Sequence, residues 1–269
     1  MSEPVRIAVA GALGRMGRAV VDATLAAEDL RLVGAADRPG VAAGAGGGGV
    51  AGPGLGVALA GDPRDAARDA DVLIDFSTAS AAAATAAALC ERPGLAFVIG
   101  ATGFTGPEEA VLRAAARTAA IVKSGNMSLG VNLLAGLVRQ AAGRLGPDWD
   151  IEIIEAHHRR KVDAPSGTAL LLAEAAALGR GVKLDEVRLP PRDGHAGPRP
   201  EGGIGFAVVR AGGIVGEHEV VFATETEVLR LAHDAADRSI FARGALAAAR
   251  WVKGKPAGLY SMQDVLGLA

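Results

Sequence analysis

One short stretch, residues 155–168, carries side chains that could bind an anion and move a proton. Residues 157–161 read His-His-Arg-Arg-Lys, so two imidazoles and three cations follow one another directly. Imidazole ordinarily titrates near neutral pH, which makes histidine the usual general acid or base. Arginine and lysine bind carboxylates and phosphates. The stretch therefore predicts a receptor for a small anionic molecule, with an acid beside it.

The neighbouring elements would position this basic cluster. Residues 151–155 are mostly β-branched and predict a strand. The apolar run 169–173 predicts a helix, which Ser166 or Thr168 could cap, and its first N–H groups would point toward the cluster. A run of basic residues is more often a solvated surface or a nucleic-acid patch. The strand and turn signals on either side favour the small-molecule site.

A second motif lies near the N-terminus. A predicted strand, 5–10, and a predicted helix, 18–27, flank the sequence Gly-Ala-Leu-Gly-Arg-Met-Gly. The dinucleotide fingerprint requires glycine at the positions held here by Ala12, Gly14 and Gly17. Gly14 would let the backbone approach a pyrophosphate, and Gly17 would let the helix pack on the strand. Ala12 departs from the pattern.

The next strand, 32–36, strengthens this motif because it ends at Asp37, twenty residues after Gly17. A carboxylate at this point can accept hydrogen bonds from the adenosine ribose. Arg38 follows and could stack on adenine or pair with a 2′-phosphate, although a solvated arginine is the alternative. A strand–helix–strand unit without any nucleotide is the alternative explanation for the whole motif.

Alternation of strands and helices continues to residue 128. Two of the predicted strands are followed by small residues, over 100–104 and 124–128. In open parallel sheets, ligands bind at such carboxyl ends of the strands. The glycine-rich segment 39–61 predicts a mobile loop. The remaining strands are expected over 71–76, 96–100 and 121–123, and the helices over 80–90 and 107–117.

The second half has a different pattern. Two predicted strands, 204–210 and 217–222, flank a glycine-rich turn and predict a hairpin, with a third strand over 227–232. Since no helix separates them, this sheet should be antiparallel or mixed. Helices are expected over 129–145, 168–178 and 241–253, a loop over 189–203, and a short C-terminal segment over 260–268.

These patterns predict an α/β protein of two domains. Residues 1–128 would form a Rossmann-type, parallel-sheet, dinucleotide-binding domain. Residues 129–239 would form an α+β domain with a mixed sheet for substrate binding and oligomerisation. Residues 240–269 would return to the dinucleotide-binding domain.

The composition excludes several classes of protein. The chain has 269 residues, of which 50% are hydrophobic and 22% charged, so it can bury a sizeable core. A net charge of −2 argues against a general nucleic-acid or membrane-surface binder. Cys90 is the single cysteine, and no Cys/His spacing suggests a metal site. No apolar stretch approaches the length of a membrane span, so a cytoplasmic protein is expected.

Taken together, the two halves resemble the 4-hydroxy-tetrahydrodipicolinate reductase (dihydrodipicolinate reductase) family of bacterial lysine and diaminopimelate biosynthesis. The resemblance runs nearly end to end and is most specific in residues 155–169; segments 14–17, 215–218 and 264–266 also fit. It implies hydride transfer from NADH or NADPH to a cyclic, unsaturated, pyridine-type dicarboxylate. It also implies a homotetramer assembled through the C-terminal sheets, without nucleic-acid or membrane partners.

The resemblance assigns roles to individual residues. His157 would be the general acid, and Lys161 would be a proton donor and substrate contact. Three residues would bind substrate: His158, Gly167 and Thr168. The implied cofactor contacts are Gly11, Ala12, Leu13, Gly14, Arg15, Met16, Asp37, Gly100, Ala101, Thr102, Ser124, Gly125, Asn126 and Met127. Arg38 is a further expected contact because of its place after Asp37.

This chain departs from the family pattern at two of these places. Ser124 and Gly125 stand where many relatives carry Ala-Pro, and Ala101 stands where others often carry threonine. Individual cofactor contacts are therefore expected to differ. The chemistry agrees with the basic cluster, because a dianionic substrate needs cations and a helix N-terminus, and hydride addition needs a positioned acid.

Two other functions fit parts of the chain. An oxidoreductase of the semialdehyde dehydrogenase type needs a nucleophilic cysteine. Cys90 is the only candidate, and its alanine-rich helical stretch does not favour a thiolate. An NAD(H)-sensing regulator without turnover would need a DNA-reading element, and only the basic cluster offers one. Steady oxidation of NADH with a dicarboxylate substrate would exclude the regulator.

Overall fold

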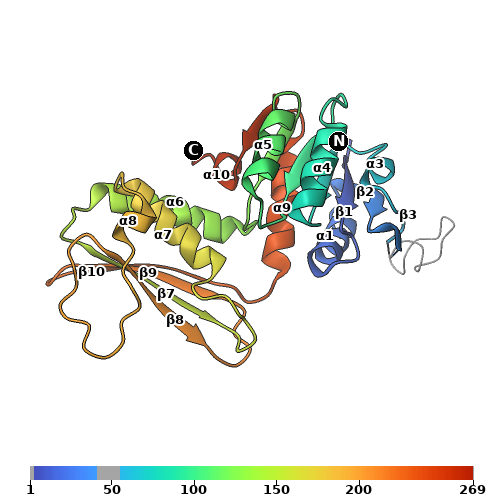
Figure 1. Ribbon diagram of the computed structural model, residues 1–269. Helices are drawn as coiled ribbons and strands as arrows, with labels where there is room; N and C mark the ends of the chain where they lie inside the picture. Colours follow the sequence, from blue (N-terminus) through green and yellow to red (C-terminus); the bar gives the residue numbers. More distant parts are fainter. Residues whose placement is uncertain (1–2, 41–54, 269) are drawn as a thin grey trace. The chain divides into compact units, whose positions relative to one another are not determined.

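The computed structural model describes residues 3–40 and 55–268, and the chain divides into two compact units. The first unit comprises Met1–Leu129 and Ser239–Ala269, and the second comprises Gly130–Arg238. Figure 1 shows a sheet with flanking helices in each. No helix formed by the described residues is long and apolar enough to cross a membrane.

The first unit is built on a seven-stranded sheet with the order β11-β6-β5-β4-β1-β2-β3. Each pair of neighbouring strands in it is parallel, so all the carboxyl ends meet at one edge. This confirms the predicted Rossmann-like sheet. The strands are β1 (Val5–Ala10), β2 (Leu30–Ala36), β3 (Leu59–Ala60), β4 (Val72–Asp75), β5 (Ala96–Ile99), β6 (Ala120–Lys123) and β11 (Gly258–Tyr260).

Helices cover both faces of this sheet, which explains why its strands are almost continuously apolar. On β1, Ile7 and Val9 face one core layer, whereas Ala8 and Ala10 face the other. The first layer packs against α1 and α9, and the second against α4 and α5. The helices of this unit are α1 (Arg15–Leu25), α3 (Pro63–Ala66), α4 (Ala79–Leu89), α5 (Gly106–Ala115), α9 (Ser239–Val252) and α10 (Met262–Val265).

Two predictions for this unit were wrong in part. Helix α1 begins at Arg15 rather than residue 18, because Gly14 is the extended N-cap residue and the next residue is already helical. Strand β3 lies within the predicted loop 39–61, where Leu59 and Ala60 pair with the end of β2. A strand this short leaves almost no periodic signal. Residues 41–54 of that predicted loop lie outside the described residues.

The second unit is a four-stranded mixed sheet with the order β10-β9-β7-β8. Alternate residues of β7 and β9 point into its core, among them Ile151, Ile153, Val220 and Phe222. Helices α6 and α7 cover this face of the sheet (Figure 1). The elements are α6 (Leu129–Arg144), β7 (Asp150–His157), α7 (Gly167–Gly179), α8 (Leu184–Val187), β8 (Ile204–Arg210), β9 (Glu217–Ala223) and β10 (Val228–Asp234).

The mixed sheet was predicted correctly, but the predicted hairpin between β8 and β9 was wrong. Strand β7 lies between them, parallel to β8 and antiparallel to β9. The central place suits β7 because Ile151 and Ile153 are completely buried, whereas β8 ends as an exposed edge at Val208 and Val209. A glycine-rich turn signals only a reversal of direction and cannot reveal that a strand distant in sequence fills the gap.

Gly17 gives a direct test of how α1 packs on the first strand. A Cβ at Gly17 would lie 1.9 Å from the carbonyl oxygen of Gly11, so backbone would have to move. Gly17→Ala should therefore lower the free energy of unfolding by about 1–3 kcal/mol, the usual cost of overpacking. Thermal unfolding by circular dichroism measures the change.

The matched control is Gly106→Ala, because Gly106 also lies in a helix of the first unit and nothing would come within 4 Å of its Cβ. That substitution should leave the melting temperature nearly unchanged. Equal melting temperatures for Gly17→Ala and Gly106→Ala would contradict the close packing at Gly17.

Candidate active site

Strand β7 changes from apolar to polar along one face. Ile151 and Ile153 lie in the core, and the next two residues on the same face are Glu155 and His157. The exposed fraction is 1% for Glu155 and 8% for His157. The basic cluster therefore starts on the strand itself: β7 ends at His157, two residues beyond the predicted strand, and not in a loop as expected.

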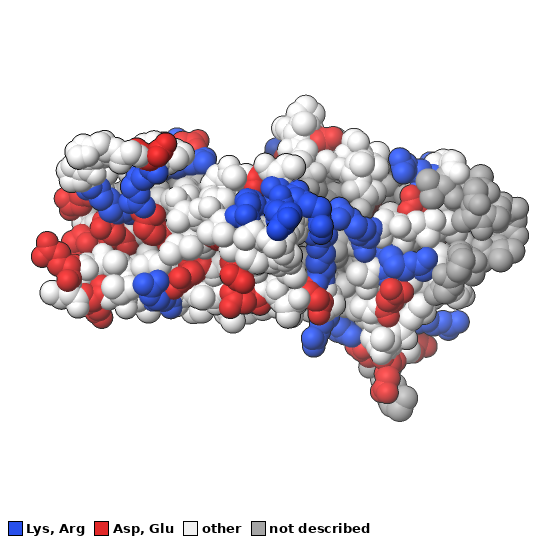
Figure 2. Space-filling model, turned by 90° about the horizontal axis from the view of Figure 1, so that it is seen from below, with Lys and Arg blue, Asp and Glu red and all other residues white. Residues whose placement is uncertain are grey.

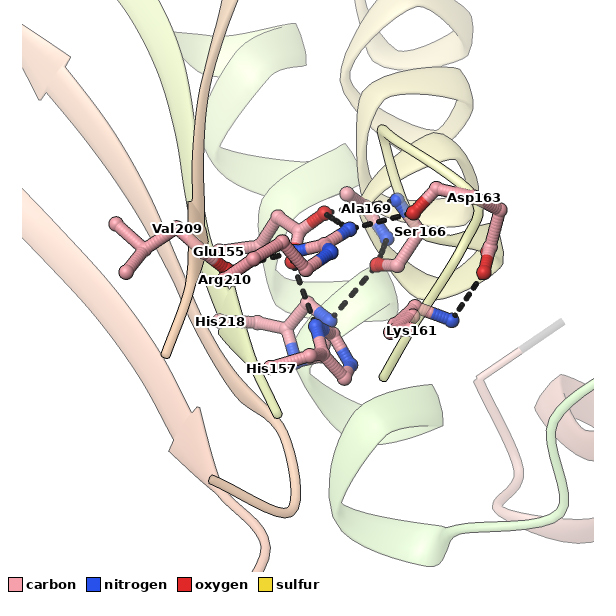
Figure 3. Close-up of polar contacts among 9 residues, drawn as sticks. All are labelled: Glu155, His157, Lys161, Asp163, Ser166, Ala169, Val209, Arg210 and His218. Carbon is pink, nitrogen blue, oxygen red and sulfur yellow. Dashed lines mark hydrogen bonds and ion pairs between the residues drawn. The ribbon is translucent and has the colours of Figure 1, made fainter. Parts of the chain in front are cut away.

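The buried carboxylate of Glu155 is held by three groups (Figure 3). Arg210, at the end of β8, donates from Nη1 to Oε2 at 2.7 Å and from Nη2 to Oε1 at 2.8 Å. The backbone N–H of Ser166 donates to Oε1 at 2.9 Å. Burial opposes ionisation of this carboxyl, but these hydrogen bonds and that to His157 outweigh it, so the pKa of Glu155 lies below its ordinary value.

His157 contacts Glu155 through one ring nitrogen. Its Nδ1 lies 2.6 Å from Oε2 of Glu155, and its ring packs edge-on against His218 with the centroids 5.0 Å apart. Burial lowers the pKa of His157 and Glu155 raises it, while Lys161 and Arg210 add to the lowering, so the net direction is downward. A protonated His157 is therefore a stronger acid than an exposed histidine.

Lys161 lies in the turn that follows β7. Its backbone N–H donates to the carbonyl of His158 at 3.0 Å, and its Nζ lies 2.9 Å from Oδ1 of Asp163. The ion pair with Lys161 lowers the pKa of Asp163. The carbonyl of Asp163 also accepts a hydrogen bond from Arg210 at 2.6 Å, so one arginine fixes both the strand end and the turn (Figure 3).

The predicted substrate residues lie on either side of this turn. Ser166 is the N-cap of α7 and accepts a hydrogen bond from the N–H of Ala169 at 3.1 Å, as one of the two proposed caps. Gly167 is exposed at the start of the helix, and nothing would lie within 4 Å of its Cβ. His158 is half-buried, and its Nδ1 has no hydrogen-bond partner among the described residues. An anion can therefore approach the N-terminus of α7 beside Thr168.

Several residues of this site had no role predicted from the sequence. Glu155 and Arg210 form its buried ion pair, and His218 approaches Ser166 with 3.2 Å between Nε2 and Oγ. Burial lowers the pKa of His218 to about 4, so this imidazole is neutral near pH 7. Glu155 could have been found from the period-two pattern of β7, because a carboxylate at a core position needs a cation. No local signal links Arg210 to it.

The nucleotide motif of the first unit has the expected geometry. Gly11 takes a φ of +71°, and a Cβ there would lie 3.0 Å from the carbonyl oxygen of Phe76. Helix α1 begins without a side-chain cap and has no acidic residue in its first turn, which suits a pyrophosphate near Arg15 and Met16. Ala12, which departs from the glycine pattern, is completely buried in the core.

Asp37 stands beside this motif at the end of β2. One carboxylate oxygen accepts the N–H of Leu13 at 2.9 Å, and the other accepts the N–H of Arg38 at 2.8 Å. The carboxylate thereby holds the glycine turn in place. Each oxygen keeps a further lone pair for a ribose hydroxyl.

The other two predicted cofactor segments follow β5 and β6. A Cβ at Gly100 would fall 2.2 Å from the ring of Phe76, so a larger residue here would require that ring to move. The methyl group of Thr102 approaches Gly125, with 3.7 Å to its Cβ position, and this contact brings the two segments together at the carboxyl edge of the sheet. Within these segments, Ala101 and Met127 are buried. The hydroxyl of Ser124 donates to the carbonyl of Asn126 at 2.7 Å, and Oδ1 of Asn126 accepts a hydrogen bond from the N–H of Ser128 at 2.9 Å.

The alternatives find less support. Cys90 follows α4, and its thiol donates to the carbonyl of Ala87 at 3.4 Å, which is no environment for a nucleophile. Among the described residues, no three His, Cys, Asp or Glu side chains gather as a metal site would require. On the face in Figure 2, Lys and Arg gather near the middle of the view, and elsewhere many of them lie among Asp and Glu.

Comparison with known proteins agrees with this geometry. A family model described as dihydrodipicolinate reductase, N-terminus, matches residues 5–127, and one described as dihydrodipicolinate reductase, C-terminus, matches residues 130–266. The 4-hydroxy-tetrahydrodipicolinate reductase of Caulobacter vibrioides is 55% identical over 268 residues, 99% of each chain. That of Rhizobium rhizogenes is 53% identical over 270 residues, 99% of this chain and 98% of its own.

A solved structure extends the similarity to the fold. The dipicolinate-bound dihydrodipicolinate reductase from Paenisporosarcina sp. TG-14 superposes with a TM-score of 0.76 at 25% identity, over 97% of this chain and 98% of its own. The chain therefore belongs to the dihydrodipicolinate reductase family of pyridine-nucleotide-dependent oxidoreductases, as its sequence motifs predict.

Proposed function

We propose that the second unit binds 4-hydroxy-tetrahydrodipicolinate or its dehydrated form, and that His157 protonates the substrate as a hydride reduces it. The observation that carries this assignment is the group formed by Glu155, His157 and Lys161 beside the N-terminus of α7. The single cysteine fits a reducing compartment, and we place the reaction in the cytoplasm.

Each residue of this group has a part in binding or proton transfer. Lys161 and the first N–H groups of α7 bind the carboxylates of the ring, with His158 beside them. NADH or NADPH supplies the hydride when bound. The negative charge that hydride addition places on the ring system is neutralised by the proton of His157, whose lowered pKa favours its release.

The first unit would hold the nucleotide through backbone groups and one carboxylate. The turn from Gly11 to Met16 faces the pyrophosphate, and Asp37 accepts hydrogen bonds from the ribose. Ala101, Thr102 and the segment 124–127 lie at the same edge of the sheet, where they can border the nicotinamide. Gly100 leaves room for the ring of Phe76 and would contact the cofactor through its backbone.

Substitution of the two proposed proton donors should give different kinetic effects. His157→Gln should lower kcat by roughly 10²–10⁴-fold with a smaller change in KM, because a general acid acts mainly in the transition state. Lys161→Ala should also raise KM, because the ammonium group binds a carboxylate in the ground state. Steady-state kinetics with both variants measure these effects.

Arg159→Ala and Arg160→Ala are the controls, because both residues are exposed members of the same basic run. They should stay close to the wild type, and NADH affinity by titration should be unchanged in all four variants. Near-wild-type kcat in His157→Gln would end its assignment as the acid. Equally mild effects in all four variants would point to a solvated basic surface.

Cofactor choice should depend on the charge of Asp37. We propose that both cofactors work and that NADH works better, because the carboxylate repels a 2′-phosphate while Arg38 offsets part of this repulsion. Asp37→Asn keeps an acceptor for the N–H of Leu13 and removes the charge, so it should narrow or reverse the preference. The ratio of kcat/KM for the two cofactors measures it. Exclusive use of NADPH by the wild type would refute this proposal.

The second unit offers a surface for self-association, and we propose a homotetramer. Its outer strands expose apolar side chains, namely Val208 and Val209 on β8 and Val228 and Leu229 on β10. Uncovered sheet edges tend to pair. Light scattering should give four times the chain mass at micromolar concentration, and Val209→Lys with Val228→Lys should reduce it. Leu25→Lys, at an exposed position on α1, is the matched control. A monomeric wild type would contradict the proposal.

A further inference from the structure

We propose that Glu155 is a positioning residue for the proton donor: its carboxylate, fixed by Arg210, binds Nδ1 of His157 and so commits Nε2 to the substrate. This inference rests on the proposed role of His157 as the general acid. It adds a residue that need not touch the substrate and that acts through the orientation and charge of the imidazole.

The geometry leaves Glu155 little freedom. Its carboxylate is almost completely buried and receives both Nη groups of Arg210 and the N–H of Ser166. The partner strands add a second constraint, because His157 pairs in register with Arg210 on β8. The 2.6 Å contact from Oε2 to Nδ1 therefore holds the ring of His157 against a fixed anchor. Since the carboxylate is ionised, it accepts, and Nδ1 must be the donor.

The other ring nitrogen of His157 then carries the transferable proton. Nε2 lies beside Gly216, where an added Cβ would come within 3.1 Å of it. Any side chain larger than hydrogen at this position would crowd the nitrogen that donates. Three features therefore leave Nε2 free to donate to the substrate. They are the conformation of β7, the hydrogen bonds of Arg210 to Glu155, and the small residue before β9.

Glu155 also balances the charges around the imidazole. The groups that face His157 are Glu155 on β7, Lys161 in the following turn, Arg210 on β8 and His218 on β9. Lys161 and Arg210 both disfavour an imidazolium, burial disfavours it further, and His218 stays neutral. Glu155 is the carboxylate in contact with the ring, so its loss should make His157 harder to protonate.

Imidazole nitrogen and carbon NMR on the full-length protein, labelled at histidine, tests this inference without any turnover. The signals of His157 are assigned by their loss in His157→Gln. In the wild type, the neutral ring should carry its proton on Nδ1, and a proton on Nε2 would overturn the proposal even if Glu155→Gln does not fold. In Glu155→Gln, the titration midpoint of His157 should move to lower pH, and an unchanged midpoint would also overturn it.

Kinetics then separate a positioning role from a structural one. The rate requires protonated His157 and falls as the pH rises through its pKa, so in Glu155→Gln this fall should begin at lower pH. The loss of kcat at pH 7.5 should be roughly 10–100-fold, as expected for one charge-assisted hydrogen bond. Glu155→Asp keeps the negative charge and should therefore retain part of the kcat that Glu155→Gln loses.

The double variant provides the decisive comparison. In a His157→Gln background, Glu155→Gln should cost almost nothing further, because the two residues act as one unit. An equal cost in both backgrounds would overturn the proposal. If the wild type does not reduce the dicarboxylate at all, the proposed function fails, whereas the NMR titration still decides the link between Glu155 and His157.

Discussion

A carboxylate buried at the end of a strand must be neutralised, and this requirement organises the second unit. An isolated charge in a protein interior is strongly unfavourable, and breaking a buried pair typically costs about 3–5 kcal/mol. Glu155 meets the requirement by drawing together the end of β8 through Arg210, the start of α7 through Ser166, and His157 on its own strand. The contacts that stabilise the buried charge of Glu155 also bring together the residues of the candidate active site.

The order of the strands makes this convergence possible. Because β7 lies between β8 and β9, its last residues have neighbours on both sides: Arg210 on one and His218 on the other. The hairpin expected from sequence would have joined β8 directly to β9 and left β7 without one of these neighbours. Strand order is set by which strand buries its apolar face most completely, and local turn signals carry no information about that competition.

The first unit was more predictable because its signals are local and redundant. A buried strand, a glycine turn, a helix and a terminal acid follow one another within a short span, and each has a steric or electrostatic reason that the structure displays in Gly17 and Asp37. Contacts with residues distant in sequence were not predictable in the same way. Gly100 leaves room for the ring of Phe76, and Ala12 is completely buried in the core.

The candidate site in the second unit was predictable only in part, because the sequence marked the basic run but not its arrangement or its contacts with Arg210 and His218. The basic run contains His157 and Lys161 and predicted a loop at a strand end, whereas His157 belongs to β7 and points the same way as Ile151 and Ile153. The alternation that builds the apolar core thus continues into the site, with Glu155 and His157 in place of isoleucine. A rigid, well-packed strand therefore carries the proposed proton donor, while the following turn carries Lys161. This division suits the chemistry, because proton transfer depends steeply on geometry and a carboxylate can be bound by a flexible ammonium group.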